Sequence, residues 1–387
     1  MLIKRTLHQE ITKYINSTEA IVVTGMRRVG KTTLLQMLFD ELQTDNKLFL
    51  DLENPLNQKY FSVENYDAII DSFSELGINS NKQSYIFLDE IQSLPQIPSI
   101  IKYLIDHYQI KFFLSGSASF YIKNLFSESL SGRKYIFELS PFSFEEFLLA
   151  KKINPPVKKD VISESTHLFY TRYLNEYIRY GGFPGVVMES SFQEKIKKLE
   201  DIFSSYWSLE VERLSDFRKK DKVRDFIFLL MQRTGSRLDI TKLSKELGVA
   251  KDTVNAYLSF LKDTYLISTI NPFSTNRDTE IRSAKKIYFI DTGILNHFAK
   301  LSEGSIFENA CFNLLSQKGS VQYYQRKNGV EIDFIFNEKT AYEIKLSAQR
   351  QYINSLVRTA KSINISDYKI ISKNYFNDPK VSFAFLL

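Results

Sequence analysis

The chain has 387 residues, a length that predicts two to four domains with a hydrophobic core in each. Hydrophobic residues make up 43% and charged residues 25%, which is typical of a globular protein and excludes a fibrous or disordered one. The single cysteine, Cys311, excludes an internal disulfide and a cysteine-based zinc site, and the four histidines lack metal-ligand spacing.

The net charge of +6 is unevenly distributed. Residues 211–290 contain 16 Lys and Arg against 10 Asp and Glu, an excess equal to that of the whole chain. A basic segment of this kind is the candidate surface for a polyanion. Because the sequence has no apolar run of 18 residues and no apolar stretch at its N-terminus, we expect no membrane contact and a cytoplasmic location.

A phosphate-binding pattern follows an amphipathic helix expected over residues 2–18. The apolar run at residues 20–24 leads directly into Gly25-x-x-x-x-Gly30-Lys31-Thr32. Two glycines let successive backbone N–H groups point at phosphate oxygens, and the next helix presents its N-terminus to the same charge. We therefore expect ATP as ligand, with Lys31 at the β- and γ-phosphates and the Thr32 hydroxyl on Mg²⁺.

The predicted nucleotide-binding loop extends from Gly25 to Thr33. Arg27 and Arg28 inside it are either nucleotide contacts or solvent-facing side chains, and the sequence does not decide between these. The predicted contacts are Gly25, Met26, Arg27, Arg28, Val29, Gly30, Lys31, Thr32 and Thr33.

Two acids end a later apolar strand. After a short strand at residues 47–53, residues 85–89 form a buried strand that runs into Asp89 and Glu90. Adjacent carboxylates at a strand tip need water, a metal or a partner. About 58 residues after a phosphate loop, this pair predicts that Asp89 holds Mg²⁺ and that Glu90 polarises the attacking water.

A third strand, residues 111–117, ends in small hydroxyl residues. Parallel strands end along one edge of a sheet, so Ser115 or Ser117 is expected beside the γ-phosphate as a sensor. A plainer interpretation, a helix N-cap, applies to Ser117 or Ser119.

Arg133 precedes the last strand expected in this region, residues 135–139. An arginine between the last helix and the last strand of such a core is placed to act as a finger on the nucleotide of a neighbouring subunit in a homo-oligomer. The alternative is a structural or surface arginine.

From Pro141 the pattern becomes helical, with a linker at residues 151–159. Residues 181–185, GGFPG, predict a rigid turn that pins two helices together, to which we assign no chemical role. Trp207 and the aromatic residues around it are expected to belong to a core.

Residues 240–267 have the form of a helix, a tight turn at Gly248 and a second helix, followed by strands around residues 270 and 287. This is helix-turn-helix spacing, and the strands suggest a winged helix. Lys251, Asp252 and Asn255 start the second helix, so Lys251, Asn255 and Lys262 are candidate DNA contacts. Base reading, nonspecific DNA contact and a structural or protein-binding role all remain open.

A second constellation lies in the last hundred residues. Glu308 is on a predicted helix, Asp333 on a strand, and Glu343-x-Lys345 on the next strand, where the period of two puts both side chains on one face. Two carboxylates would bind Mg²⁺ while the lysine orients water. The alternative is that these polar residues lie on the exposed face of an edge hairpin. Of the two chemical roles, metal binding is favoured over cleavage.

Together these motifs resemble a widespread family of bacterial and archaeal AAA-type ATPases. The shared features, in order, are GxRRVGKTTL, an LDEIQ strand, a GS-type sensor, an SGR element, a PFSFEEF-like helix and GGFP. The resemblance implies that Gly25, Gly30, Lys31 and Thr32 form the nucleotide loop and that Asp89 and Glu90 are the Mg²⁺ and water positions. It also implies a C-terminal half of unknown function that resembles a winged helix followed by a PD-(D/E)xK nuclease-like fold, with Asp333, Glu343 and Lys345 as its motif.

The sequence therefore predicts an α/β protein with an AAA-like P-loop NTPase core built on a parallel sheet. The expected regions are the ATPase domain at 1–150, a helical linker region at 151–235, a winged helix at 236–298 and a restriction-endonuclease-like α/β domain at 299–387. The expected function is an ATP-hydrolysing, DNA-associated protein that uses Mg²⁺. The rival is a nucleotide-dependent switch that binds a protein partner, with an inactive nuclease-like end.

Overall fold

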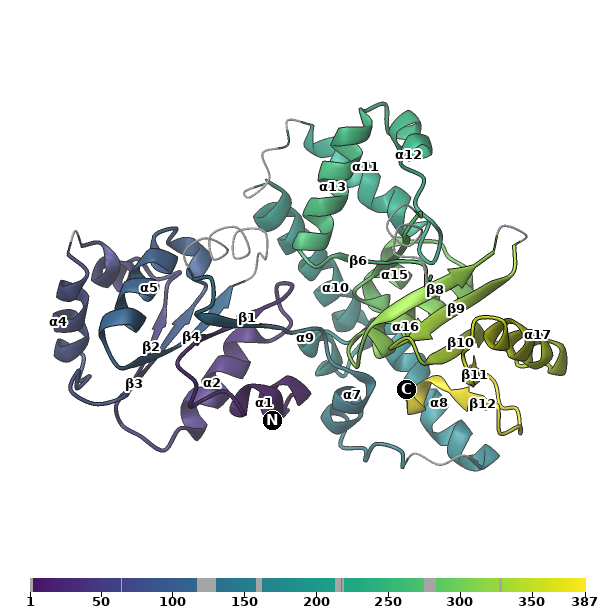
Figure 1. The fold of residues 1–387 in the computed structure, drawn as a ribbon, viewed down its shortest axis with the longest axis horizontal. Helices are drawn as coiled ribbons and strands as arrows, with labels where there is room; N and C mark the ends of the chain where they lie inside the picture. Colours follow the sequence, from purple (N-terminus) through teal and green to yellow (C-terminus); the bar gives the residue numbers. More distant parts are fainter. Residues whose placement is uncertain are drawn as a thin grey trace. The chain divides into compact units, whose positions relative to one another are not determined.

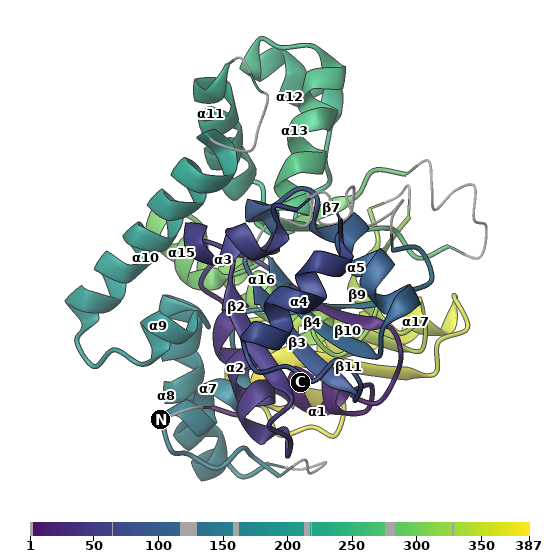
Figure 2. The same cartoon turned by 90° about the vertical axis from the view of Figure 1, so that its left-hand side faces the viewer.

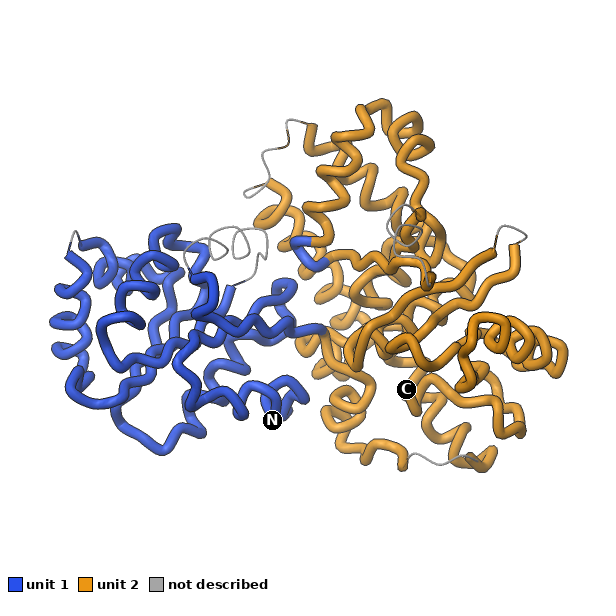
Figure 3. The backbone as a smooth tube through the Cα atoms, viewed as in Figure 1, with its two compact units in different colours: residues 1–140, 263–265 blue, residues 141–262, 266–387 orange. Residues whose placement is uncertain are grey.

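A computed structural model describes residues 3–63, 65–116, 130–157, 162–212, 217, 219–274, 283–326 and 329–387. Ser117 and Ser119, expected near the nucleotide or at a helix cap, lie outside these residues. The chain divides into two compact units (Figure 3): unit 1 is Met1–Ser140 with Asp263–Tyr265, and unit 2 is Pro141–Lys262 with Leu266–Leu387. The finer division into four domains stays a prediction.

Unit 1 is built on a five-stranded parallel sheet of order β2-β3-β4-β1-β5 (Figure 1). β4 is the central strand in this order, and β1 lies between β4 and the edge strand β5. The carboxyl ends of all five strands lie along one edge, which is where the predicted nucleotide residues fall. The strands are β1 Ala20–Thr24, β2 Lys47–Asp51, β3 Ser84–Asp89, β4 Ile110–Gly116 and β5 Lys134–Glu138.

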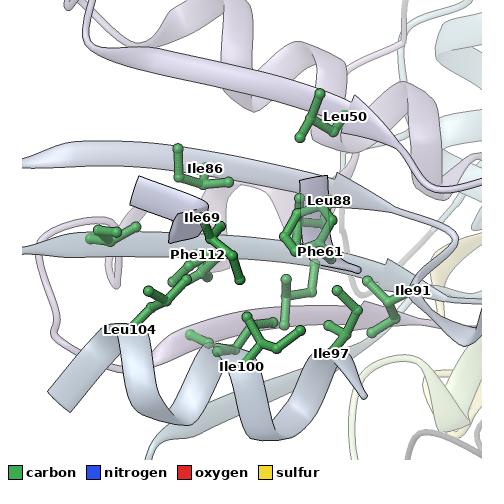
Figure 4. Close-up of a cluster of buried hydrophobic side chains, with 14 of the residues drawn as sticks. Leu50, Phe61, Ile69, Ile86, Leu88, Ile91, Ile97, Ile100, Leu104 and Phe112 are labelled. Carbon is green, nitrogen blue, oxygen red and sulfur yellow. The ribbon is translucent and has the colours of Figure 1, made fainter. Parts of the chain in front are cut away.

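Helices cover both faces of this sheet (Figures 1 and 2). Alternate residues of each strand face opposite sides, so β3 directs Ile86 and Leu88 to one face and Phe87 to the other. On the first face they pack with α4 and α5 in a core that Figure 4 shows around Ile100. On the second face, Phe39 of α2 meets Phe87 edge-on, with ring centroids 5.3 Å apart.

The helical segments of unit 1 have these bounds: α1 Thr6–Thr12, α2 Lys31–Glu41, α3 Pro55–Gln58, η1 Lys59–Phe61, α4 Asp67–Glu75, η2 Ile91–Ser93 and α5 Ile97–His107. The helix expected over residues 2–18 is shorter, α1 alone. The turn that follows it is held by the buried Lys111, whose ammonium donates to the carbonyls of Tyr14, at 2.9 Å, and Ser17, at 2.8 Å.

Unit 2 begins with helices, as the sequence predicts. Ser143 and Glu146 form a capping box that starts the first of them. The helices are α7 Phe144–Ala150, α8 Glu164–Tyr180, α9 Pro184–Val187, α10 Phe192–Tyr206, a π-helical turn at Trp207–Glu212, and α11 Lys220–Met231.

The GGFPG turn receives a structural explanation. The buried carboxylate of Asp291 accepts a hydrogen bond from the Gly182 N–H at 2.7 Å and caps α15, Thr292–Phe298, through Gly293 at 2.9 Å. Gly181 has φ +77°, and a Cβ there would lie 2.1 Å from Asp291 Oδ1. Glycine at 181 therefore lets the end of α8 meet the start of α15.

The helix-turn-helix elements are present as expected. α12, Ile240–Leu247, ends at Gly248 with φ +66°, and α13, Lys251–Asp263, follows. Two antiparallel strands come next, β6 Ile267–Ile270 and β7 Lys286–Phe289. Naming this segment a winged helix stays a proposal.

The C-terminal part contains a mixed five-stranded sheet of order β12-β11-β10-β9-β8. β8, β9 and β10 pair antiparallel, whereas β10, β11 and β12 pair parallel. The elements are α16 Glu303–Ser316, β8 Val321–Gln325, β9 Glu331–Phe336, β10 Thr340–Lys345, α17 Arg350–Lys361, β11 Asp367–Ser372, β12 Val381–Phe383 and η4 Ala384–Leu386. Across the described ranges, no helix has the length and apolar character needed to cross a membrane.

Candidate functional site

The glycine-rich loop joins β1 to α2, as a phosphate loop requires. Gly25 has φ +148°, and a Cβ there would lie 2.2 Å from the Leu139 carbonyl oxygen, so only glycine permits this close approach. Gly30 is left-handed, with φ +98°, and begins α2. The first turn of α2 therefore directs its N–H groups toward the space above the loop.

Lys31 lies within this loop. Its side chain is buried, and its ammonium donates to the carbonyls of Gly25 and Met26, both at 3.1 Å. These two bonds place a positive charge at the loop itself, where phosphate oxygens would be bound.

Asp89 ends β3 and is surrounded by hydroxyl donors. The hydroxyl of Ser115 on the neighbouring strand β4 contacts its Oδ1, and the Thr32 hydroxyl also hydrogen-bonds the carboxylate. Burial raises the pKa of the Asp89 carboxyl, and these hydrogen bonds act in the opposite direction because they stabilise the anion. Thr32 and Asp89 thus meet at one point, as a shared metal ion would require.

Glu90 follows directly in the left-handed conformation, with φ +53°. Its N–H lies 3.4 Å from the Ser115 hydroxyl, and its carboxylate accepts a bond from the amide of Gln92 in η2. A non-glycine residue in this conformation is strained, and such strain concentrates at functional sites. Ser115 thus contacts the Asp89 carboxylate and the Glu90 backbone N–H, and the Gln92 amide contacts the Glu90 carboxylate.

The remaining loop residues have separate positions. Arg27 is half-buried, with Nη1 4.0 Å from Glu53 Oε1, whereas Arg28 is exposed and left-handed, with φ +66°. Val29 is buried, and Thr33 is exposed on the first turn of α2. The nucleotide contacts of Arg27 and Arg28 stay a prediction.

Arg5 of the N-terminal segment also contacts the loop. The residue is 6% exposed, and its guanidinium donates to the carbonyls of Val29, at 2.9 Å, and Ser140, at 2.6 Å. Sequence reasoning missed this residue because no local pattern marks it.

Arg133 lies near the amino ends of the strands, away from the carboxyl ends that carry the phosphate loop. Its carbonyl accepts from Ala20 at the start of β1, whereas the phosphate loop follows the end of β1. Its Nε donates to Asp106 of α5 at 2.7 Å, and the side chain is 38% exposed. Arg133 is therefore remote from the phosphate loop of its own chain, and a role on a neighbouring subunit stays a proposal.

The three candidate DNA contacts share one side of α13. Lys251, Asn255 and Lys262 are all exposed, and spacings of four and seven residues place them on the same helix face. The adjoining face of α13 packs into the core through Val254 and Leu261.

In unit 2, the structure brings together the four residues of the nuclease-type motif. The Lys345 ammonium lies 2.7 Å from Glu343 Oε1 and 3.9 Å from Asp333 Oδ2, and the same Asp333 oxygen accepts from the Ile344 N–H at 2.7 Å. Glu308 on α16 belongs to the same group, since its charge acts on Lys345 and the charge of Asp333 acts on it.

Three further polar residues join this cluster and were not predicted: Lys286, Tyr288 and Glu331. Glu331 was detectable, because it alternates with Asp333 on one face of β9. Lys286 and Tyr288 come from β7, about 20 residues before Glu308, and no local pattern links them to it. By the same logic as for Asp89, the sequence also offered Asp51, which ends β2 in register with Asp89.

The cluster brings four carboxyl groups together with two lysines in a partly buried place. Burial, and next the charge of Asp333, raise the pKa of Glu308 and that of Glu343, each to about 7. Burial lowers the pKa of Lys286, but Glu308, Asp333 and Glu331 outweigh it and raise that pKa overall. The protonation of each carboxyl and ammonium group in the cluster therefore depends on the charges of its neighbours.

A metal ion does not fit the cluster as it is arranged. Within the part of the chain that the structure describes, no three His, Cys, Asp or Glu side chains are placed to hold one. The ammonium groups of Lys345 and Lys286 lie against the carboxylates that a metal would use. The cluster as arranged therefore does not support metal-assisted cleavage.

Comparison with known families agrees with the geometry of unit 1. Residues 17–148 match a family described as an AAA domain. The chain carries an AAA-type P-loop ATPase domain. Residues 171–305 match a second family, described only as a domain of unknown function, so the nuclease-like character of the C-terminal part is not confirmed.

Relatives extend over most of the chain. An uncharacterized protein of Methanocaldococcus jannaschii is 25% identical over 392 residues, covering 96% of this chain and 86% of its own. One of Haemophilus influenzae is 25% identical over 350 residues, covering 87% and 84%. Among solved structures, the Walker-type ATPase of Pyrococcus abyssi is similar, with a TM-score of 0.46 and 14% identity, covering 77% of this chain and 96% of that one.

Proposed function

We propose that the chain hydrolyses ATP at the P-loop and links turnover to DNA binding by the helix-turn-helix segment. The observation that carries the first half is the meeting of Thr32 and Ser115 at Asp89, with Glu90 next to them. This arrangement has a phosphate cradle, an acid for Mg²⁺ and a second acid for water.

Each residue has a distinct task in this proposal. The loop N–H groups and Lys31 bind phosphate oxygens, and Thr32 with Asp89 would hold Mg²⁺, which neutralises phosphate charge when bound. Ser115 fixes the Asp89 carboxylate through its hydroxyl. Glu90 orients the attacking water and accepts its proton, and the Gln92 amide sets the direction of its carboxylate.

The DNA half rests on charge and exposure. Residues 211–290, which include α13, carry the basic excess of the sequence, and Lys251, Asn255 and Lys262 are exposed on one face of that helix. Such a face supports phosphate contact in the first instance, because lysines bind the DNA backbone without reading its sequence.

The test is ATP turnover with and without duplex DNA, at low and at moderate salt. We expect DNA to change turnover by about fivefold or more, as coupled binding sites typically do, and the DNA affinity to fall steeply with salt because counterions are released. Wild-type protein that binds no DNA at low salt would overturn the DNA half and leave the ATPase half standing.

The second candidate is a nucleotide-dependent switch that binds a protein partner. It is favoured by large apolar side chains that the helices of residues 141–212 expose: Leu149, Leu168, Phe169, Met188 and Phe192. In this case turnover would respond to the partner and not to DNA. The nuclease-type role of Glu308, Asp333, Glu343 and Lys345 is a separate proposal, to which the lysine contacts are unfavourable.

A further inference from the structure

Strand β7 presents two polar side chains to Glu308. Lys286 and Tyr288 are two residues apart and so face the same side. The Lys286 side chain is 5% exposed, and its ammonium lies 3.9 Å from Glu308 Oε1 and contacts Glu331 Oε1 directly. The Tyr288 hydroxyl donates to the same Glu308 oxygen at 2.7 Å.

Neighbouring residues fix this junction independently of any charge. Asn309, beside Glu308 on α16, accepts from the Phe289 N–H at 2.9 Å and donates to the Phe289 carbonyl at 2.8 Å. Gly235 has φ +75°, and a Cβ on this residue would lie 3.0 Å from Glu308 Oε1, so the backbone of residue 235 packs closely against Glu308. α16 is therefore held on β7, and the carboxylate of Glu308 is directed at Lys286.

The charges of the cluster explain why a cation is needed there. Glu308, Glu331 and Asp333 all act on Lys286, and carboxylates that converge in a partly buried site repel one another unless a cation lies among them. Proteins supply that cation as a metal ion or as a lysine or arginine side chain. Here a lysine from a different element of the fold occupies the position.

We propose that Lys286 is the resident counter-cation of Glu308 and Glu331, taking the place of a divalent metal and joining the β6–β7 pair to the C-terminal sheet. The inference goes beyond the proposed function, since it involves neither ATP nor DNA. It identifies a cation site that is permanently filled from within the chain.

The test is the full-length Lys286→Met variant, in which a chain of similar shape lacks the charge. In EDTA and without nucleotide, we expect its melting temperature to fall by roughly 5 °C or more, because two half-buried carboxylates lose their partner. Mn²⁺ should restore the melting temperature, and calorimetry should show Mn²⁺ binding about tenfold tighter than in the wild type, whose melting temperature Mn²⁺ leaves unchanged.

Two matched variants separate charge from packing. Lys286→Arg keeps the cation and should behave as the wild type in EDTA. The double variant Lys286→Met, Glu331→Gln removes one carboxylate with the lysine and should recover part of the lost stability without metal. If Lys286→Met does not fold in EDTA, its refolding yield with and without Mn²⁺ becomes the readout.

Two results would overturn the proposal. One is a Lys286→Met protein with the wild-type melting temperature in EDTA and no gain in Mn²⁺ affinity. The other is wild-type protein that binds Mn²⁺ more tightly than Lys286→Met does, which would make Lys286 a support of a metal site rather than its substitute. ATP turnover, measured in parallel, tests the proposed function separately.

Discussion

Buried and half-buried acids are stabilised differently in the two units. In unit 1, Asp89 is hydrogen-bonded by the hydroxyls of Ser115 and Thr32. In unit 2, Glu343 and Glu308 lie against the ammonium groups of Lys345 and Lys286, and Asp291 accepts from three backbone N–H groups. Hydroxyl donors leave the negative charge of a carboxylate in place, whereas an ammonium group cancels it.

This difference distinguishes a site that can still bind an incoming cation from sites whose carboxylates already have a partner within the chain. A carboxylate held by hydroxyls is fixed in direction and still attracts a cation, which suits the nucleotide site. A carboxylate paired with lysine or with backbone N–H groups has its partner within the chain. We therefore expect substitutions in unit 1 to change turnover and those in unit 2 to change stability.

The largest effect is expected at Glu90. Glu90→Gln should retain ATP but lower turnover by about 100-fold or more, because only the water-activating group is lost. Lys31→Ala should instead weaken ATP binding. The matched change in unit 2, Glu343→Gln, should leave turnover intact; ATP hydrolysis and nucleotide affinity are measured for all three. Equal turnover by wild type and Glu90→Gln would remove the assignment of Glu90.

Asp291 should give the largest loss of stability. Asn at this position turns an N–H donor toward the Gly182 N–H, so Asp291→Asn should lower the free energy of unfolding by about 2–4 kcal/mol in denaturant titrations. Gly181→Ala should cost a similar amount, whereas Gly185→Ala, with only Lys198 Cδ at 4.0 Å from the new Cβ, should cost little. A stable Gly181→Ala protein would contradict the close approach.

The same residue predicts a pH dependence. Burial raises the pKa of Asp291 from 3.8 to about 6, so the folded chain binds this proton more tightly than the unfolded chain. Its contribution to stability is fully present below pH 3.8 and is lost as the pH rises through about 6. Asp291→Asn should lack this slope, and parallel slopes for the two proteins would show that another group titrates.

Arg133 tests whether the site in unit 1 is completed by a second copy of the chain. Arg133→Ala should retain ATP and lower turnover by about tenfold or more. Mixing it with Glu90→Gln protein should restore some activity. Asp106→Asn removes the same ion pair but keeps the arginine, so it should leave turnover unchanged. Similar losses for both variants, without rescue on mixing, would make the pair structural.

The smallest effect is expected from surface charge. Reversal of Lys251 and Lys262 to Glu should weaken duplex binding and reduce the slope of log affinity against log salt by about 2, because each lysine neutralises about one phosphate. Reversal of Lys197 and Lys300, exposed lysines outside α12 and α13, changes the net charge equally and should leave the slope unchanged. Equal slopes for both pairs would exclude α13 as the DNA surface.

The sequence predicted where the residues of the candidate nucleotide site lie, because they follow strand ends in a parallel sheet; their roles stay predictions. The P-loop, Asp89, Glu90 and Ser115 needed only the period of the strands and the rule that such ends share an edge. The parallel sheet, the helical region and the helices on either side of Gly248 were also found from local pattern.

The contacts that the sequence did not predict join residues that are far apart along the chain. Arg5 contacts Ser140, Asp291 contacts Gly182, and Lys286 contacts Glu331. A local hydrophobic period does not indicate which distant residues will touch. The GGFPG turn therefore had no explanation, and the carboxylate cluster was expected without its β7 lysine. Both became clear only from the packing of elements against each other.

The contact of the phosphate loop with residues 139–140 has a consequence for signal transmission. The Leu139 N–H donates to the Thr24 carbonyl at 2.7 Å, and Arg5 ties Val29 in the loop to Ser140, the last residue of unit 1 before Pro141. Arg5 therefore joins the phosphate loop, through two hydrogen bonds, to the residue at which the first segment of unit 1 ends. We expect a backbone shift in the loop to be felt at Ser140, and Arg5→Met to remove that coupling while the residues of the loop itself stay in place.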